Sequence, residues 1–210
     1  MNSPKDELTA LLALNRIDRI GSIRAKYLYE QLGSAQEIFR NRKHLNEIIT
    51  GVNQSLINAL DDSGVFIKAE EELQFIEENH IRCLTPEHQD YPSRLRDCED
   101  APLLLFTLGN ADLNTTKIVS VVGTRRASEY GRRMCNRLIE ELQTLCPHIV
   151  IVSGLAYGID AISHKAALDN NCKTVGVLAH GLDMIYPRTN RDMAKRMLDC
   201  GGLVTEFMSQ

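Results

Sequence analysis

The stretch Ile118–Ser128, IVSVVGTRRAS, decides the fold class. It begins with a mostly β-branched run, which is typical of a buried strand, and passes through Gly123 into a polar turn that opens a helix. The same order recurs, with further strands expected at 149–152, 174–178 and 203–206 and helices at 129–145, 160–169 and 190–200. Short buried strands that alternate with helices of this length predict a parallel, doubly wound α/β sheet over residues 117–210.

The helix expected at 129–145 is amphipathic, and one stripe along it is apolar. Residues three and four apart lie on the same side of a helix. We therefore expect this stripe to place the helix on the sheet; it consists of Met134, Leu138, Leu142 and Leu145.

The first eighty residues read as a small all-α domain. Helices are expected near 8–20, 23–32, 35–40, 54–59 and 68–79, with Gly33 and Ser34 as the cap residues between the second and third. The pattern resembles paired helix-hairpin-helix or SAM-like modules, which often bind the DNA backbone through a turn that contains glycine. The turn at Gly21 lacks a second glycine, so both DNA contact and packing against a partner stay open. Residues 81–116 are interpreted as a connector with short strands.

The composition and the charge distribution indicate an ordinary globular protein with one locally basic segment. The net charge is −4, and 43% of the residues are hydrophobic, as in ordinary globular proteins. Acidic residues predominate between 61 and 100, whereas residues 117–140 carry six bases and two acids, which favours one local anion site. The six scattered cysteines form no CxxC pair and are interpreted as buried hydrophobes, so no metal or cofactor is expected. The absence of a signal peptide and of a long apolar run predicts a cytoplasmic protein.

The first candidate site is the turn that follows the first strand of the sheet. Gly123 allows a sharp bend, and the following backbone N–H groups and the next helix N-terminus attract anions. Arg125 and Arg126 add forked donors that suit phosphate oxygens. Because ligands of such sheets bind beyond the carboxyl ends of the strands, we expect a phosphate at Gly123, Thr124, Arg125 and Arg126. The G-x-G-x-x-G fingerprint of dinucleotide enzymes is absent.

The second turn, SGLAYGID at 153–160, lies between the next strand and its helix. Ser153, Gly154 and Gly158 are expected to form a second anion-binding nest. Asp160 either caps the following helix or contacts a base or ribose. His164 lies one turn later, and it is either a core histidine or part of a catalytic Asp–His pair.

The third turn, AHGLDMIYPRTN at 179–190, follows the next strand. We expect Gly181 to lie at the same edge of the sheet as the other two turns. Tyr186 either stacks on a base or anchors the loop to the last helix. Asn190 is most simply the N-cap of that helix, and it also belongs to the expected site.

The segments GTRRASEYG, SGLAYGIDAISHKAAL and GLDMIYPRTN resemble, in this order, the DNA-processing protein A (DprA/Smf) family. The lead-in YPSRLRDCEDAPLLLFTLGN and the helical domain fit as well. The resemblance implies a Rossmann-like domain behind a helical domain, single-stranded DNA binding, and loading of the RecA recombinase during natural transformation. It also implies that the phosphate-binding arginine is Arg125 and that the glycine-rich pocket is formed by Ser153, Gly154 and Gly158.

Two features depart from the family pattern. Tyr157 occupies a position where many members carry a basic or polar residue. The chain ends at Gln210, where the sheet of the family continues, so the C-terminal part of the fold and the usual homodimer surface are expected to be missing.

Two other classes of function stay open. A Rossmann-type enzyme such as a nucleoside monophosphate hydrolase would need a carboxylate at the glycosidic bond, and Asp160, Asp183 and Glu206 are the candidates. None of them lies in a glycine-rich catalytic segment, so no catalytic residue is assigned. The other class is a scaffold with a vestigial pocket.

Overall fold

The computed structural model describes residues 4–17, 20–62 and 64–209. The chain divides into two compact units, Met1–Leu104 and Leu105–Gln210. Arg19, in the expected first helical hairpin, and the first three residues of the N-terminus lie outside the described residues.

The first unit consists mainly of short helices, as the sequence predicts. Gly33 adopts a left-handed conformation (φ 69°) and ends one helix, and the Ser34 hydroxyl accepts a hydrogen bond from Glu37 N at the start of the next. The unit ends with a short strand, as expected for the connector, and with a helical turn that was not expected. Its elements are α1 (Pro4–Asn15), α2 (Ser22–Leu32), α3 (Ala35–Arg40), η1 (Arg42–His44), α4 (Leu45–Ile48), α5 (Gln54–Leu60), α6 (Gly64–Glu78), β1 (Arg82–Leu84) and α7 (Ser93–Arg96).

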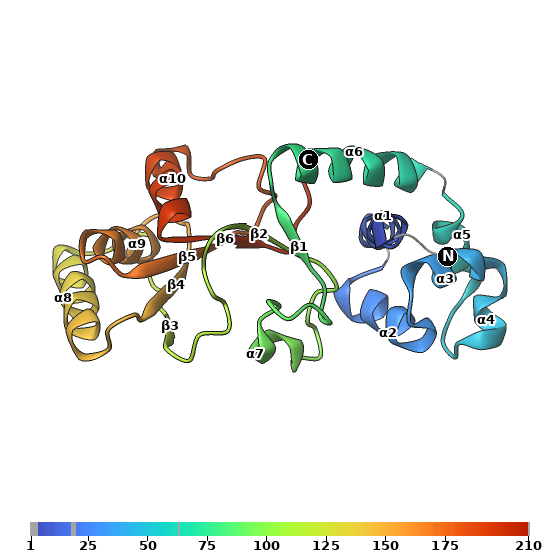
Figure 1. Ribbon diagram of the computed structural model, residues 1–210, viewed down its shortest axis with the longest axis horizontal. Helices are drawn as coiled ribbons and strands as arrows, with labels where there is room; N and C mark the ends of the chain where they lie inside the picture. Colours follow the sequence, from blue (N-terminus) through green and yellow to red (C-terminus); the bar gives the residue numbers. More distant parts are fainter. Residues whose placement is uncertain (1–3, 18–19, 63, 210) are drawn as a thin grey trace. The chain divides into compact units, whose positions relative to one another are not determined.

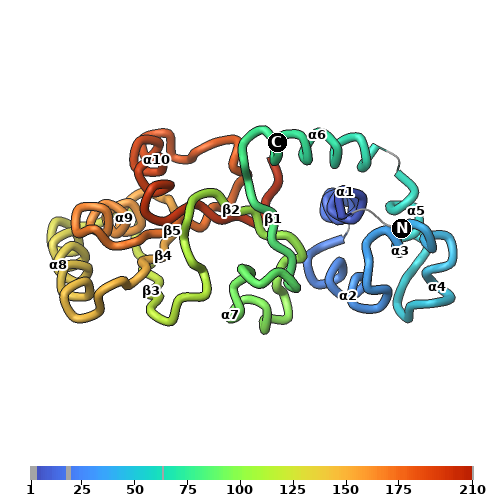
Figure 2. Tube along the Cα trace, in the orientation of Figure 1, coloured from blue at the N-terminus to red at the C-terminus, as the bar shows by residue number. Residues whose placement is uncertain are grey.

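Helix α1 is the centre of the first unit. It packs against α2, α3 and α6, and Figure 2 shows it end-on between α6 and α2. Leu12 and Leu14 are fully buried. The Glu7 carboxylate accepts hydrogen bonds from Ser34 Oγ (2.7 Å) and Ala35 N (2.6 Å), so α1 also supplies a negative charge to the N-terminus of α3.

The second unit contains the predicted sheet. Its strands lie in the order β2-β6-β5-β4-β3. Strands β3 to β6 are parallel, whereas β2 pairs with β6 in the antiparallel direction. The elements are β2 (Leu105–Gly109), β3 (Ile118–Ser120), α8 (Glu129–Leu145), β4 (Val150–Gly154), α9 (Ile159–Asp169), β5 (Lys173–Val177), η2 (Arg188–Asn190), α10 (Arg191–Asp199) and β6 (Gly201–Thr205).

The three crossover helices lie on one face of this sheet. Strands β3, β4, β5 and β6 follow one another in a single direction, and parallel crossovers are right-handed. Accordingly α8 packs against α9 and α9 packs against α10. Figure 1 shows the three helices side by side along the sheet. The mixed α/β fold with a mostly parallel sheet is confirmed. The second winding direction of a doubly wound sheet does not occur among the described strands.

Helix α8 packs on the sheet through a different face from the one that we expected. Cys135 and Ile139 are buried against the sheet and α9. Of the four leucine and methionine positions of the expected stripe, only Leu142 is partly buried. Met134, Leu138 and Leu145 are 43%, 47% and 78% exposed, so the prediction was wrong for these three.

The six cysteines are all free thiols. Cys135 and Cys172 are buried, as we expected, but Cys98 is exposed, so the prediction fails for that residue. Burial raises the pKa of the Cys83 thiol to about 12, which keeps it protonated. Among the described residues, none of the helices is long and apolar enough to cross a membrane.

Candidate functional site: a cleft at the carboxyl edge of the sheet

The three turns that we singled out converge on one cleft. Its volume is about 170 Å³, and it lies beyond the ends of β4 and β5. Arg125 comes from the first turn, Leu155 and Tyr157 come from the second, and His180 and Tyr186 come from the third. The sequence therefore predicted the position of the cleft and part of its lining. The lining is largely apolar, with the Arg125 guanidinium as its basic group.

Two glycines allow the first and second turns to pack closely against each other. A Cβ on Gly123 would lie 2.6 Å from Ile159 Cγ1, so only glycine leaves room for that side chain. Gly158 has φ +80°, and a Cβ there would overlap the Thr124 carbonyl oxygen. Ile159 N donates a hydrogen bond to the same oxygen at 3.1 Å. These glycines therefore hold the two turns in register, which is a packing role that the sequence reading had not assigned to them.

The second turn does not form the nest that we expected around its serine hydroxyl. Ser153 is 3% exposed, and its Oγ donates to the Val121 carbonyl at 2.6 Å. This hydrogen bond therefore links β4 to the residue that follows β3. A Cβ on Gly154 would lie 2.6 Å from Asp160 Oδ2, so Gly154 makes room for that carboxylate. Asp160 lies in the first turn of α9, where Gly158 is the N-cap and no side chain caps the helix.

His164 is a core residue that holds the second turn. It is fully buried, with Nε2 2.6 Å from the Gly154 carbonyl and Nδ1 2.7 Å from Thr174 Oγ1. Since a carbonyl can only accept, Nε2 carries a proton and donates it to the Gly154 carbonyl, while the Thr174 hydroxyl also donates to the Ile151 carbonyl at 2.9 Å. Burial lowers the pKa of His164, although the Gly154 carbonyl and the Asp160 charge act in the opposite direction. The contacts therefore support a core role for this histidine rather than a place in a catalytic Asp–His pair.

Hydrogen bonds also hold the third turn in place, and one of them is buried. Asn190 occupies the N-cap position of α10, but its side chain does not cap the helix. Its Nδ2 donates instead to the Leu155 carbonyl of the second turn at 2.8 Å. His180 Nδ1 lies 2.8 Å from the Gly181 carbonyl, and Tyr186 N donates to His180 Nε2 at 3.3 Å. A Cβ on Gly181 would lie 2.5 Å from Asp183 Oδ1, so this glycine too makes room for a neighbour.

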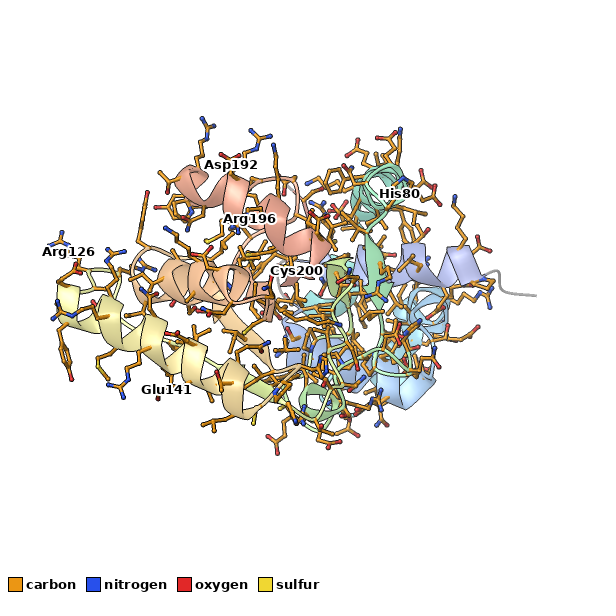
Figure 3. All side chains as sticks on the ribbon, turned by 60° about the vertical axis from the view of Figure 1, so that its left-hand side comes forward. His80, Arg126, Glu141, Asp192, Arg196 and Cys200 are labelled. Carbon is orange, nitrogen blue, oxygen red and sulfur yellow. The ribbon has the colours of Figure 1, made fainter. Side chains whose placement is uncertain are left out.

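The arginines of the first turn are free to bind an anion. Arg125 and Arg126 are exposed, and no described carboxylate lies within ion-pair distance of either. Figure 3 shows Arg126 projecting outward beside the start of α8. Arg126 N donates to Thr124 Oγ1 at 3.1 Å, which shapes the turn. Ser128 then caps α8 by accepting from Gly131 N at 3.1 Å.

Comparison with known families identifies this architecture. The family model described as DNA recombination-mediator protein A matches residues 82–210, more than half of the chain. The chain belongs to the DNA recombination-mediator protein A family. The match begins at β1 and covers all three turns of the cleft.

Individual members of the family show the same relationship. DNA processing protein DprA of Streptococcus pneumoniae is 46% identical over 101 residues, which cover 48% of this chain and 35% of the relative. Protein Smf of Synechocystis is 28% identical over 93% of this chain and 50% of its own length. The chain thus spans half or less of the length of these curated relatives.

Two solved structures of family members share the fold. DprA from Streptococcus pneumoniae has a TM-score of 0.58 and 28% identity over 90% of this chain and 68% of its own. DprA from Helicobacter pylori, studied for its single-stranded DNA binding mode, has a TM-score of 0.53 and 28% identity over 62% of this chain and 56% of its own.

Two further arginines near the cleft were missed in the sequence reading. A larger depression of about 680 Å³ is lined by Leu182, Met184, Arg188 and Arg191. No described carboxylate pairs with either arginine. The signal was available, because both follow Tyr186-Pro187 in the third turn and flank Asn190, but we considered that turn only for its aromatic and capping residues.

The carboxylates that an enzyme would need are not gathered in the main cleft. Asp160 and Glu206 line neither of the two depressions, and Asp183 lines only the one that contains Arg188 and Arg191. Within the described ranges, no three histidine, cysteine or acidic side chains are grouped to hold a metal ion.

Proposed function

We propose that this chain binds single-stranded DNA at the carboxyl edge of its sheet and acts as a recombination mediator. One observation carries the proposal. The unpaired guanidinium of Arg125 lines a mostly apolar cleft that also contains two exposed tyrosines, Tyr157 and Tyr186. This combination suits a nucleotide strand, which presents phosphate charge and apolar base faces together.

The arginines supply the contacts to phosphate. Arg125 and Arg126 lie beside the N-terminus of α8, and Arg188 and Arg191 line the neighbouring depression. A guanidinium donates two parallel hydrogen bonds to phosphate oxygens, and here it does so without first breaking an ion pair. We propose that successive phosphates of one strand lie on these two groups of arginines.

The tyrosines supply the contacts to bases. Tyr157 is 47% exposed and Tyr186 is 61% exposed, so both rings are available for stacking. Stacking of a base on an aromatic ring contributes about 1–3 kcal/mol and depends little on sequence. The cleft therefore fits a strand of any sequence, and the study of the Helicobacter pylori relative as a single-stranded DNA-binding protein supports this choice of ligand.

The cellular role follows from the family rather than from the cleft. The family description as a recombination mediator supports a role in delivering single strands to a RecA-type recombinase during natural transformation. Physical association of the purified chain with that recombinase on a single strand tests this part separately. We expect no release of free base from nucleoside monophosphates.

A binding titration tests the main proposal. Binding of a fluorescent oligo-dT is measured by anisotropy at two salt concentrations for the native chain, Arg125→Ala and Arg196→Ala. Arg196 is the matched control, because it lies on α10 of the same unit and pairs with Asp169 at 3.6 Å. A charged hydrogen bond contributes about 1.5–3 kcal/mol, so Arg125→Ala is expected to weaken binding about tenfold or more and Arg196→Ala very little. The loss of one phosphate contact also lowers the salt slope by about 0.7. Binding that is insensitive to both salt and Arg125 contradicts the proposal.

A further inference from the structure

The loop from His180 to Tyr186 is joined at its two ends by one side chain. His180 Nδ1 lies 2.8 Å from the carbonyl oxygen of Gly181, and Tyr186 N lies 3.3 Å from His180 Nε2. The imidazole ring therefore bridges the start of the loop and the residue that ends it. His180 and Tyr186 also line the cleft that contains Arg125, so this bridge lies within the site itself.

The two contacts fix which ring nitrogen of His180 carries the proton. A carbonyl oxygen can only accept a hydrogen bond, so Nδ1 is protonated and donates to the Gly181 carbonyl. A backbone N–H can only donate, so Nε2 is unprotonated and accepts from Tyr186 N. The neutral imidazole with its proton on Nδ1 satisfies both contacts at once. Because both ring nitrogens are used within the protein, the ring has no polar atom left for a phosphate.

The backbone of His180 is itself held by strand β6. Thr205 Oγ1 lies 2.9 Å from the His180 carbonyl oxygen and 3.2 Å from that of Leu178. Thr205 is 1% exposed, so these contacts are made inside the protein. The imidazole is thus attached to the end of the sheet and supports the opposite, more exposed end of the loop.

We propose that His180 is a positioning residue for single-stranded DNA and that it acts through Tyr186. The ring of Tyr186 is 61% exposed, so its place at the cleft depends on its backbone, and the backbone N–H is bonded to His180. A ring that is held in place before the strand arrives loses less conformational entropy when a base stacks on it. This inference rests on the proposed function, because it requires a strand in the cleft.

Anisotropy titration of oligo-dT with two substitutions of His180 tests the proposal. His180→Gln places an amide oxygen near the position of Nε2, where it accepts from Tyr186 N. His180→Asn places its amide near the position of Nδ1 and does not reach that N–H. We therefore expect His180→Asn to weaken binding about fivefold or more and His180→Gln to bind within about twofold of the native chain. Equal losses for the two variants, or no loss for His180→Asn, overturn the proposal.

A double substitution tests whether His180 acts through Tyr186. Tyr186→Ala removes the stacking ring, so adding His180→Asn to that variant is expected to change binding by less than about twofold. A further loss of about fivefold in the double variant would mean that His180 contacts the strand by itself, and it contradicts the proposal. His148→Asn is the matched control, because His148 is exposed and precedes β4, at the opposite edge of the sheet.

Hydrogen exchange of the Tyr186 amide gives a readout that does not involve DNA. The chain has six tyrosines, so labelling with ¹⁵N-tyrosine gives a small set of amide signals in NMR spectra, and Tyr186→Phe identifies the one required. Exchange at Tyr186 is expected to be about threefold or more faster in His180→Asn than in the native chain, and unchanged in His148→Asn. Equal exchange in His180→Asn and the native chain overturns the proposal.

The two readouts separate this proposal from the proposed function. A native chain that does not bind oligo-dT overturns the proposed function and, with it, the role of His180 in binding. Binding that depends on Arg125 but not on His180 overturns only the positioning role.

Discussion

Replacement of Gly158 by Ala tests how the cleft is held together. Gly158 has φ +80° and ψ −129°, a backbone region that only glycine adopts readily, and a Cβ there would overlap the Thr124 carbonyl oxygen. Such backbone strain costs about 1–3 kcal/mol. The hydrogen bond from Ile159 N to the displaced oxygen contributes about 1 kcal/mol more. We therefore expect Gly158→Ala to lower the free energy of unfolding by about 2–4 kcal/mol.

Gly33→Ala is the matched control for this substitution. Gly33 also has a positive φ, +69°, but nothing lies within 4 Å of the position that its Cβ would take. Its replacement therefore costs only the left-handed backbone penalty of about 1–2 kcal/mol. Equilibrium urea unfolding gives both values, and oligo-dT titration is expected to show weaker binding for Gly158→Ala alone, because Arg125 moves with Thr124. Equal unfolding costs for the two variants would refute the close fit of the two turns.

The other predictions concern buried polar groups that hold the second turn. The pKa of His164 is lowered mainly by burial, so as the pH falls its imidazole is protonated in the unfolded chain at a higher pH than in the folded protein. The free energy of unfolding therefore falls as the pH falls below about 6.5. Urea unfolding at several pH values between 7.5 and 5 is expected to show a steeper loss for the native chain than for His164→Asn; identical slopes would show that His164 contributes nothing. Asn190→Ala removes the donor to the buried Leu155 carbonyl and is expected to cost about 1–3 kcal/mol in the same assay, while a cost near zero would mean that this bond does not hold the turn.

Much of the second unit could be predicted from the sequence, because its strands and helices are encoded locally. The helix expected at 129–145 has those bounds in the structure, and the strands lie within about two residues of their expected positions. The convergence of the three turns also follows from general rules, since parallel strands place their carboxyl ends at one edge. Arg125 lines the cleft as expected from its position after β3.

The buried face of α8 could not be chosen correctly from periodicity alone. The stripe of Met134, Leu138 and Leu145 and the stripe of Cys135 and Ile139 both have helical spacing, and they lie one residue apart. The stripe of leucine and methionine residues was expected to face the sheet. In the structure Cys135 and Ile139 face the sheet and α9, whereas Met134, Leu138 and Leu145 are exposed.

The hydrogen bonds of the second turn explain why its sequence motif predicts an anion-binding nest that the structure does not form. The carbonyl oxygens of Gly154 and Leu155 would repel a phosphate if they faced the cleft unpaired. They accept hydrogen bonds instead from His164 and Asn190, which lie on α9 and at the start of α10. Donors that lie far away in the sequence thus bind the carbonyl oxygens of this turn from inside the protein. What remains for a ligand is an apolar surface with an unpaired guanidinium, and phosphate affinity at this cleft is therefore expected to depend on Arg125 more than on the backbone of the glycine-rich turn.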